Sequence, residues 1–137
     1  MRTTTVAIRR KGFTLVELVI VVLILGILAA VALPKMTATT ATAKTNGTKQ
    51  TLATVRDAIE FYKVQNGAYP GDAAGLPVAL KPFLKGPFPA APLGANAGSS
   101  AVVAGTDPPA VVTGGSGWAY TASTGDFYLN DASGLTW

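Results

Sequence analysis

Residues 11–34 read KGFTLVELVIVVLILGILAAVALP, and this stretch decides the fold. Between Leu18 and Leu33 no side chain is polar or charged, and Pro34 ends the run. A helix from Phe13 to Leu33 would be about 31 Å long, which matches the roughly 30 Å hydrocarbon core of a bilayer. The sequence therefore predicts a membrane-spanning helix over residues 13–34.

Glu17 lies inside the predicted membrane-spanning segment, between Val16 and Leu18. An ionised carboxylate at the centre of a membrane helix costs at least about 2.5 kcal/mol, so its presence needs an explanation. One interpretation is that Glu17 lies shallow enough to reach the lipid headgroups. The other is that it pairs with a positive group of another molecule.

The charge of the chain is concentrated before this run. The net charge is +4, and four of the 11 basic residues precede Gly12, so that the remaining chain is neutral. A net positive charge that is confined to the first 11 residues does not predict nucleic-acid binding. The positive-inside rule instead places residues 1–12 in the cytoplasm and the C-terminal part on the other side of the membrane.

Composition excludes several classes of site. The chain has no cysteine and no histidine, which excludes thiol catalysis, imidazole bases and the usual zinc sites. The acids form no close pair suited to acid–base catalysis, so we expect a protein that is not an enzyme. A secretory signal peptide is the competing interpretation of the N-terminus, but the apolar run is too long and Leu33-Pro34-Lys35 offers no small-residue cleavage site.

The pattern predicts that the helix continues through residues 35–66. Pro34 is expected to kink or loosen it, and the threonine-rich part that follows has weak helix propensity. From residue 49 onward the helix becomes amphipathic, with an apolar stripe made by Leu52, Val55, Ile59 and Tyr62. Gly67 favours a left-handed C-terminal cap after Asn66, and Pro70 prevents continuation.

Residues 67–137 are expected to form a head of the α+β class. A short helix is predicted over residues 76–84, and a hairpin turn over residues 123–126. Runs of strand-forming residues between turn signals predict strands at residues 101–104, 110–113, 117–121 and 127–130. We expect a small antiparallel sheet that packs on the apolar stripe. The aromatic residues other than Trp137 are expected to form the core, namely Phe61, Tyr62, Tyr69, Trp118, Tyr120, Phe127 and Tyr128.

The motif from Lys11 to Glu17, with the apolar run and Pro34 after it, resembles the type III signal of type IV prepilins and type II secretion pseudopilins. The resemblance implies a pilin-like fold, cleavage of the leader between Gly12 and Phe13 by a prepilin peptidase, and N-methylation of Phe13. The helix would anchor the subunit in the inner membrane and later form the core of a helical homopolymer. There Glu17 would pair with the N-terminal amine of a neighbour.

The segment from Asn66 to Leu80 is similar to the one that follows the long helix in major (G-type) pseudopilins. With the absence of cysteine, this favours a subunit of a periplasmic type II secretion pseudopilus, assembled by an inner-membrane platform. The alternatives are a major or minor subunit of a type IV pilus for adhesion, motility or DNA uptake, and a single-span membrane protein whose head binds a ligand or DNA. Cleavage at Gly12 separates the last of these from the others.

Asp126, Asn130 and Asp131 could supply hard oxygen ligands to calcium, which takes about six to eight. Major pseudopilins resemble this chain in having a calcium site late in the head, although their acidic, glycine-rich run is not reproduced here. The alternative is that these three are ordinary turn and loop residues and that the protein has no cofactor.

Overall fold

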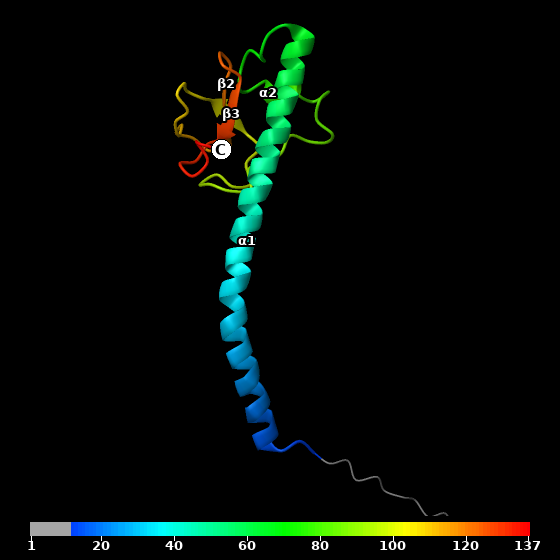
Figure 1. The fold of residues 1–137 in the computed structure, drawn as a ribbon, viewed down its shortest axis with the longest axis vertical. Coiled ribbons are helices and arrows are strands. Elements are labelled where there is room, and N and C mark those ends of the chain that lie inside the picture. Colours follow the sequence, from blue (N-terminus) through cyan, green and yellow to red (C-terminus); the bar gives the residue numbers. More distant parts are fainter. Residues whose placement is uncertain (1–11) are drawn as a thin grey trace, which may run out of the picture. The chain divides into compact units, whose positions relative to one another are not determined.

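A computed structural model describes residues 12–137, so the rest of the predicted leader, residues 1–11, lies outside the described residues. The elements in chain order are α1 (Leu15–Asn66), α2 (Leu76–Ala79), β1 (Val102–Ala104), β2 (Trp118–Thr121) and β3 (Asp126–Leu129). The long N-terminal helix and the small sheet confirm the predicted α+β class (Figure 1). The chain divides into two compact units, with the boundary between Thr39 and Thr40.

The helix is unbroken through Pro34 and through the threonine-rich part that was expected to be weak. The threonine hydroxyls along this part donate to main-chain carbonyls one turn earlier, as Thr39 does to Lys35 at 2.9 Å and Thr48 to Lys44 at 2.8 Å. Each of these carbonyls also lies at the position that accepts the helical N–H of the same threonine, so the hydroxyl finds its acceptor without taking the chain out of the helix. The low intrinsic propensity of threonine is therefore compatible with a continuous helix.

The apolar stripe on the second half of α1 packs into the core as predicted. Leu52, Val55 and Ile59 are fully buried, and Tyr62 packs against them from the edge. The helix ends at Asn66, where Gly67 has φ +79° and donates to the Lys63 carbonyl at 2.8 Å. This is the left-handed C-terminal cap that the sequence predicts.

The short helix is shorter than the predicted residues 76–84. It ends at Ala79 and continues as turns, because Pro82 has no N–H to donate to the Val78 carbonyl. In the turns that follow, the Leu80 carbonyl accepts hydrogen bonds from the main-chain N–H groups of both Phe83 and Leu84.

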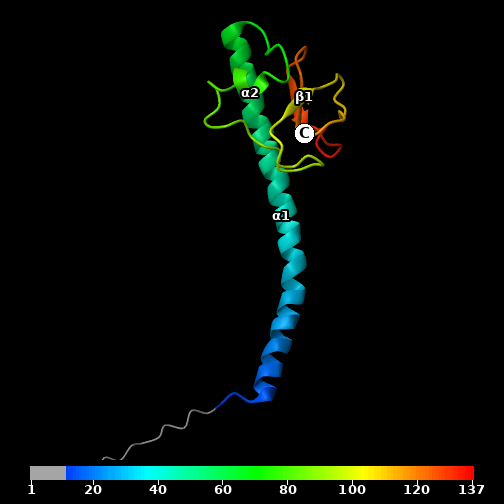
Figure 2. The same ribbon diagram turned by 180° about the vertical axis from the view of Figure 1, so that it is seen from behind.

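The sheet has the order β1-β2-β3 and lies beside the second half of α1 (Figure 2). The β2–β3 hairpin is antiparallel as predicted, with Gly125 at φ +82° in its turn. The pairing of β1 with β2 is parallel, so the prediction of a wholly antiparallel sheet is wrong. Parallel neighbours need a crossover of about a dozen residues or more, and residues 105–117 supply it.

The crossover occupies the segment in which residues 110–113 were predicted to be a strand. Those residues form no strand, because the main chain of Val112 hydrogen-bonds to the side chain of Asn130 rather than to a neighbouring strand. The start of the crossover is held by the Tyr128 hydroxyl, which accepts a hydrogen bond from the Thr106 amide at 2.9 Å.

Both faces of the sheet are consequently covered. The face toward the apolar core carries Trp118, Tyr120, Phe127 and Leu129, each at most 1% exposed. The opposite face carries Ala119 and Tyr128, which are also buried. The polar groups of two core aromatics donate hydrogen bonds to main-chain carbonyls. The Trp118 indole N–H donates to the Pro89 carbonyl at 2.9 Å, and the Tyr120 hydroxyl donates to the Pro70 carbonyl at 3.0 Å. The prediction that the aromatic residues form the core is confirmed for Trp118, Tyr120, Phe127 and Tyr128. It is wrong for Phe61, whose side chain is 64% exposed on the opposite side of α1 from the apolar stripe.

Candidate assembly segment at the N-terminus

The first turn of α1 is closed by a capping box. The amide and the hydroxyl of Thr14 donate to Glu17 Oε2 at 2.9 and 2.8 Å, and the Glu17 amide donates back to the Thr14 hydroxyl at 3.2 Å. This is the reciprocal arrangement in which a threonine at the N-cap and a glutamate three residues later satisfy helix N–H groups that lack a helical partner. A carboxylate in the first turn is also favoured by the helix dipole.

Glu17 therefore has a hydrogen-bonding role inside its own chain. The sequence interpretations considered only the headgroups and a neighbouring molecule, although a threonine and a glutamate three residues apart before an apolar run are the sequence signature of this cap. The carboxylate stays exposed at the helix start. It can keep its bonds to Thr14 and still meet a positive group from outside.

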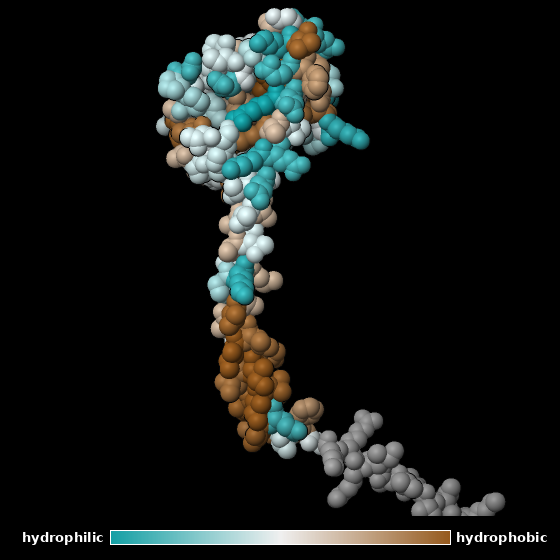
Figure 3. Space-filling view, in the orientation of Figure 1, coloured by the Kyte–Doolittle hydropathy of each residue, from teal (hydrophilic) through white to brown (hydrophobic). Residues whose placement is uncertain are grey.

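The surface that follows Glu17 is apolar on all sides. The large apolar side chains from Phe13 to Met36 are all at least 49% exposed, and Figure 3 shows them as a continuous apolar zone on the N-terminal part of α1. Within the described residues, α1 is the one helix that is long and apolar enough to cross a membrane. Water cannot cover such a surface at low cost, so lipid or other protein must.

The predicted cleavage site lies just before this helix. Gly12 and Phe13 precede the helix start in an exposed segment, and the Phe13 side chain is 84% exposed. A Cβ added at Gly12 would meet no atom within 4 Å. Packing within the chain therefore does not demand glycine at this position, and a requirement for glycine there would come from a processing enzyme.

The three predicted calcium ligands are engaged in separate local contacts. The Asp126 carboxylate accepts from the Thr124 hydroxyl at 2.6 Å in the β2–β3 turn. The Asn130 amide accepts from the Val112 amide at 2.8 Å and donates to the carbonyls of Val112 and Ser116 at 2.9 and 3.1 Å. Asn130 thus clamps the crossover against the end of β3.

Asp131 holds two loops together. Its carboxylate accepts from the hydroxyl of Ser133 at 2.6 Å, from the Ser133 amide at 3.0 Å and from the Ala95 amide at 3.1 Å. The bonds from Ser133 are the main reason that the pKa of Asp131 lies below its ordinary value.

The structure does not bring the three residues together as one set of ligands. Asp126 begins β3 and Asn130 follows its end, so they are about 13 Å apart along the extended chain. Within residues 12–137 no group of three or more acidic, histidine or cysteine side chains is arranged to hold a metal ion. A calcium site at these residues stays a prediction.

Arg56 is a residue that the sequence interpretation missed. It lies on α1 beside the apolar stripe, and its guanidinium donates to main-chain oxygens of Phe127 and Trp137. A basic residue that flanks an apolar stripe was the available signal, but its acceptors are 71 and 81 residues away in the chain and cannot be inferred from spacing.

Comparison with known proteins gives one match. Residues 8–33 match the family model of the prokaryotic N-terminal methylation motif. No curated protein and no solved structure matches the chain. The matched segment covers the predicted cleavage site, the capping box and most of the exposed apolar helix. The chain thus carries the N-terminal methylation motif, which supports a type IV pilin-like prepilin that is structural rather than enzymatic.

Proposed function

We propose that this chain is a structural subunit of a type II secretion pseudopilus. It is inserted as a prepilin, cleaved after Gly12, N-methylated at Phe13 and polymerised through its N-terminal helix. The observation that carries the proposal is the combination of the methylation motif at residues 8–33 with a helix whose apolar side chains are exposed on every side.

The physical argument starts from this exposed surface. Lipid covers it while the subunit waits in the inner membrane, and the helices of neighbouring subunits cover it in the filament. Exchange of lipid for protein gives little hydrophobic gain, so helix packing and polar contacts must direct assembly. Glu17 supplies such a contact, since its exposed carboxylate can meet the amine of Phe13 on an adjacent subunit in a low-dielectric setting.

The partners and the locations follow from the same steps. A prepilin peptidase removes residues 1–12 on the cytoplasmic side, and an inner-membrane platform adds the subunit to the growing homopolymer. The head, residues 67–137 with the second half of α1, lies in the periplasm before and after assembly.

The choice of a pseudopilus over a type IV pilus rests on the sequence. The segment from Asn66 to Leu80 is similar to that of major pseudopilins, and the chain has no cysteine for a disulfide in the head. The described head has a buried aromatic core around Trp118 and Phe127, whose ring centroids are 5.1 Å apart, to stabilise it without that bond.

Processing tests the proposal at its first step. In cells with an active prepilin peptidase, intact mass should show loss of residues 1–12 and addition of one methyl group at Phe13. Peptidase-deficient cells are the control and should retain the full chain. Chains that begin at Met1 in the peptidase-positive cells, or that are cut after Ala32, would contradict the proposal.

Deletion of the gene separates the two kinds of filament. Loss of protein export with surface pili unchanged is expected for a pseudopilus subunit. Loss of surface pili, motility or DNA uptake with export unchanged would instead assign the chain to a type IV pilus.

A further inference from the structure

The outer face of α1 in the head carries an exposed ridge, made of Asp57, Glu60, Phe61 and Val64. These residues recur at helical spacing on the side of α1 opposite to the buried Leu52, Val55 and Ile59. Phe61 is 64% exposed and Val64 is 83% exposed, and the four residues line a shallow hollow. Phe61 and Val64 lie one turn apart, so their exposed side chains form one apolar patch, and the carboxylates of Asp57 and Glu60 lie one turn before it along the helix.

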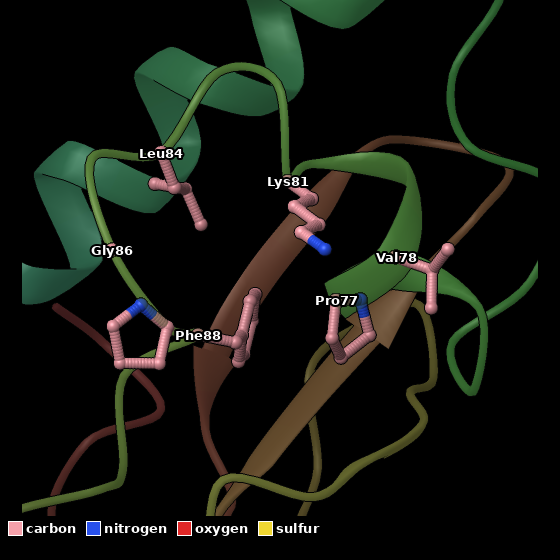
Figure 4. Close-up of a pocket in the computed structure, with 7 residues that line it drawn as sticks. Pro77, Val78, Lys81, Leu84, Gly86 and Phe88 are labelled. Atoms are coloured by element: carbon pink, nitrogen blue, oxygen red, sulfur yellow. The ribbon is translucent and has the colours of Figure 1, made fainter.

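A second surface of the same head is complementary to this ridge. Figure 4 shows a cleft between α2 and the loop that follows it, with Pro77 and Phe88 on its two sides and Lys81 extending between them. Its volume is about 460 Å³, and its lining includes Pro77, Val78, Lys81, Leu84, Pro87 and Phe88. Val78 is 75% exposed at the cleft. A second lysine, Lys85, lines the adjoining hollow with Leu84 and Pro87.

The charges of the two surfaces are opposite. The ridge carries two carboxylates beside its apolar side chains, and the cleft carries Lys81, with Lys85 next to it. In the described part of the chain, Asp57, Lys81 and Lys85 form no ion pair with another side chain. Glu60 accepts a hydrogen bond from the Tyr69 hydroxyl at 3.0 Å and interacts electrostatically with Lys63 on the same helix.

We propose that the ridge of one subunit docks into the cleft of a second copy of this chain, with Phe61 entering the apolar cleft and Asp57 and Glu60 facing Lys81 and Lys85. This inference rests on the proposed filament function and names the contact between heads within the filament. The occupant is a second copy because one chain presents both halves of the contact.

The two surfaces lie on different segments of one head, so the contact is head-to-tail. After one contact has formed, the cleft of the first subunit and the ridge of the second remain free. A contact of this kind propagates as an open helical filament unless its rotation closes a ring. A symmetric contact, ridge against ridge, would stop at a dimer and would bring four carboxylates together.

The contact is small, and this suits assembly at the membrane. A ridge of four side chains lies well below the roughly 1,200 Å² that stable complexes bury, so free heads should remain monomeric. Subunits whose N-terminal helices are already packed hold their heads at high effective concentration. The ridge and the cleft then fix the register between neighbours.

Thiol cross-linking tests the geometry, and the chain contains no cysteine of its own that could interfere. The double variant Val64→Cys with Val78→Cys keeps Phe61, is expressed as the full chain in cells that assemble the parent, and is treated with a short bis-maleimide. A ladder of dimers, trimers and longer species is expected, because each subunit carries both reactive positions. The control pair is Val64→Cys with Val111→Cys, since Val111 is 51% exposed but lies in the crossover outside the cleft. It should give no ladder.

Reversal of the charges of Asp57 and Lys81 tests whether the ridge and the cleft recognise each other through ion pairs. Asp57→Lys places a cation opposite the lysines and should lower the number of filaments at least about tenfold, as like charges across an interface cost several kcal/mol. Adding Lys81→Asp to the same chain should restore filaments toward the parent level, while membrane-bound subunit stays constant in all variants.

Each outcome decides a different question. If the parent chain forms no filaments, the proposed function and the contact both fail. If the parent forms filaments but the Val64 and Val78 pair gives no ladder, the contact alone is overturned. Dimers from Val64→Cys alone, without longer species, would replace it by a symmetric contact. Failure of Lys81→Asp to restore Asp57→Lys would remove the charge pairing.

Discussion

Arg56 Nε donates to the carbonyl oxygen of Phe127 at 2.9 Å, and this bond joins the long helix to β3. The same guanidinium reaches the main-chain oxygen of Trp137 at 2.5 Å. The Trp137 ring is also held, since the Lys49 ammonium lies 5.2 Å from its centroid. One face of α1 thus binds the sheet and the last residues of the chain through charged side chains, in addition to the apolar stripe.

Both partners of each of these contacts lie within residues 40–137. We therefore expect the fragment 37–137 to fold as a soluble monomer. The stripe from Leu52 to Ile59 keeps its sheet, and the removed part holds the exposed apolar surface. Circular dichroism and size exclusion chromatography measure the result. A disordered or aggregated fragment would mean that the head needs the first half of the helix.

Arg56→Ala is expected to destabilise this fragment by about 2–3 kcal/mol, because two main-chain acceptors lose a charged donor. Urea unfolding followed by tryptophan fluorescence measures the change. Arg56→Lys should fall between the parent and Arg56→Ala, since lysine keeps the charge but cannot reach both oxygens with one planar group. The control Lys44→Ala, on the exposed face of the same helix, should stay within about 0.5 kcal/mol of the parent.

The parts of the fold that depend on neighbours in sequence could be predicted. The stripe of α1, its end at Gly67 and the β2–β3 hairpin are all determined by residues within one or two turns of each other. The capping box of Thr14 and Glu17 was equally local, and its spacing was readable in the sequence. Only its signature was overlooked, in favour of partners outside the chain.

The parts that depend on distant contacts could not be predicted. The parallel pairing of β1 is fixed by the crossover, which the Asn130 amide and the Tyr128 hydroxyl hold from the far end of the sheet. Two of the predicted calcium ligands illustrate a related limit of sequence reasoning. Asp126 and Asn130 are neighbours in sequence, but an extended strand separates its residues by about 3.3 Å each, so closeness in sequence does not give closeness in space.

Tyr120 should make the head sensitive to high pH. Burial is the main cause that raises the pKa of Tyr120 to about 12, above the ordinary value of about 10. The folded state then binds more protons than the unfolded state between these two values. The stability that this tyrosine contributes is complete below about pH 10 and is lost as the pH rises toward 12, with a slope of at most about 1.4 kcal/mol per pH unit.

The variant Tyr120→Phe isolates this effect. It should be less stable near pH 7 by about 1 kcal/mol, since the bond from the hydroxyl to the Pro70 carbonyl is lost, but its stability should fall less steeply above pH 10. Urea unfolding of parent and variant at a series of pH values gives both quantities. Equal alkaline slopes in the two proteins would show that Tyr120 does not carry the pH dependence.

Glu17 is expected to act in two separable ways, as the cap of its own helix and as the counter-charge for a neighbour. Glu17→Gln keeps an acceptor for the Thr14 amide and hydroxyl but removes the charge, because glutamine can also close a capping box. Thr14→Ala does the reverse, since it removes the hydroxyl of the cap and leaves the carboxylate. Glu17→Ala removes both.

If assembly needs the charge, membrane levels and leader cleavage should survive in all three variants, while filaments should be lost in Glu17→Gln and Glu17→Ala. Thr14→Ala should still assemble, because loss of a cap costs only about 1 kcal/mol, whereas an amine that enters a low-dielectric helix bundle without a counter-charge costs several. Filaments are counted by electron microscopy, with membrane-bound subunit measured in parallel. Abundant filaments from Glu17→Gln but not from Glu17→Ala would show that the cap, and not the charge, is what assembly requires. Abundant filaments from Glu17→Ala would reduce the carboxylate to a tolerated contact with the headgroups, and the pairing between subunits would have to be abandoned.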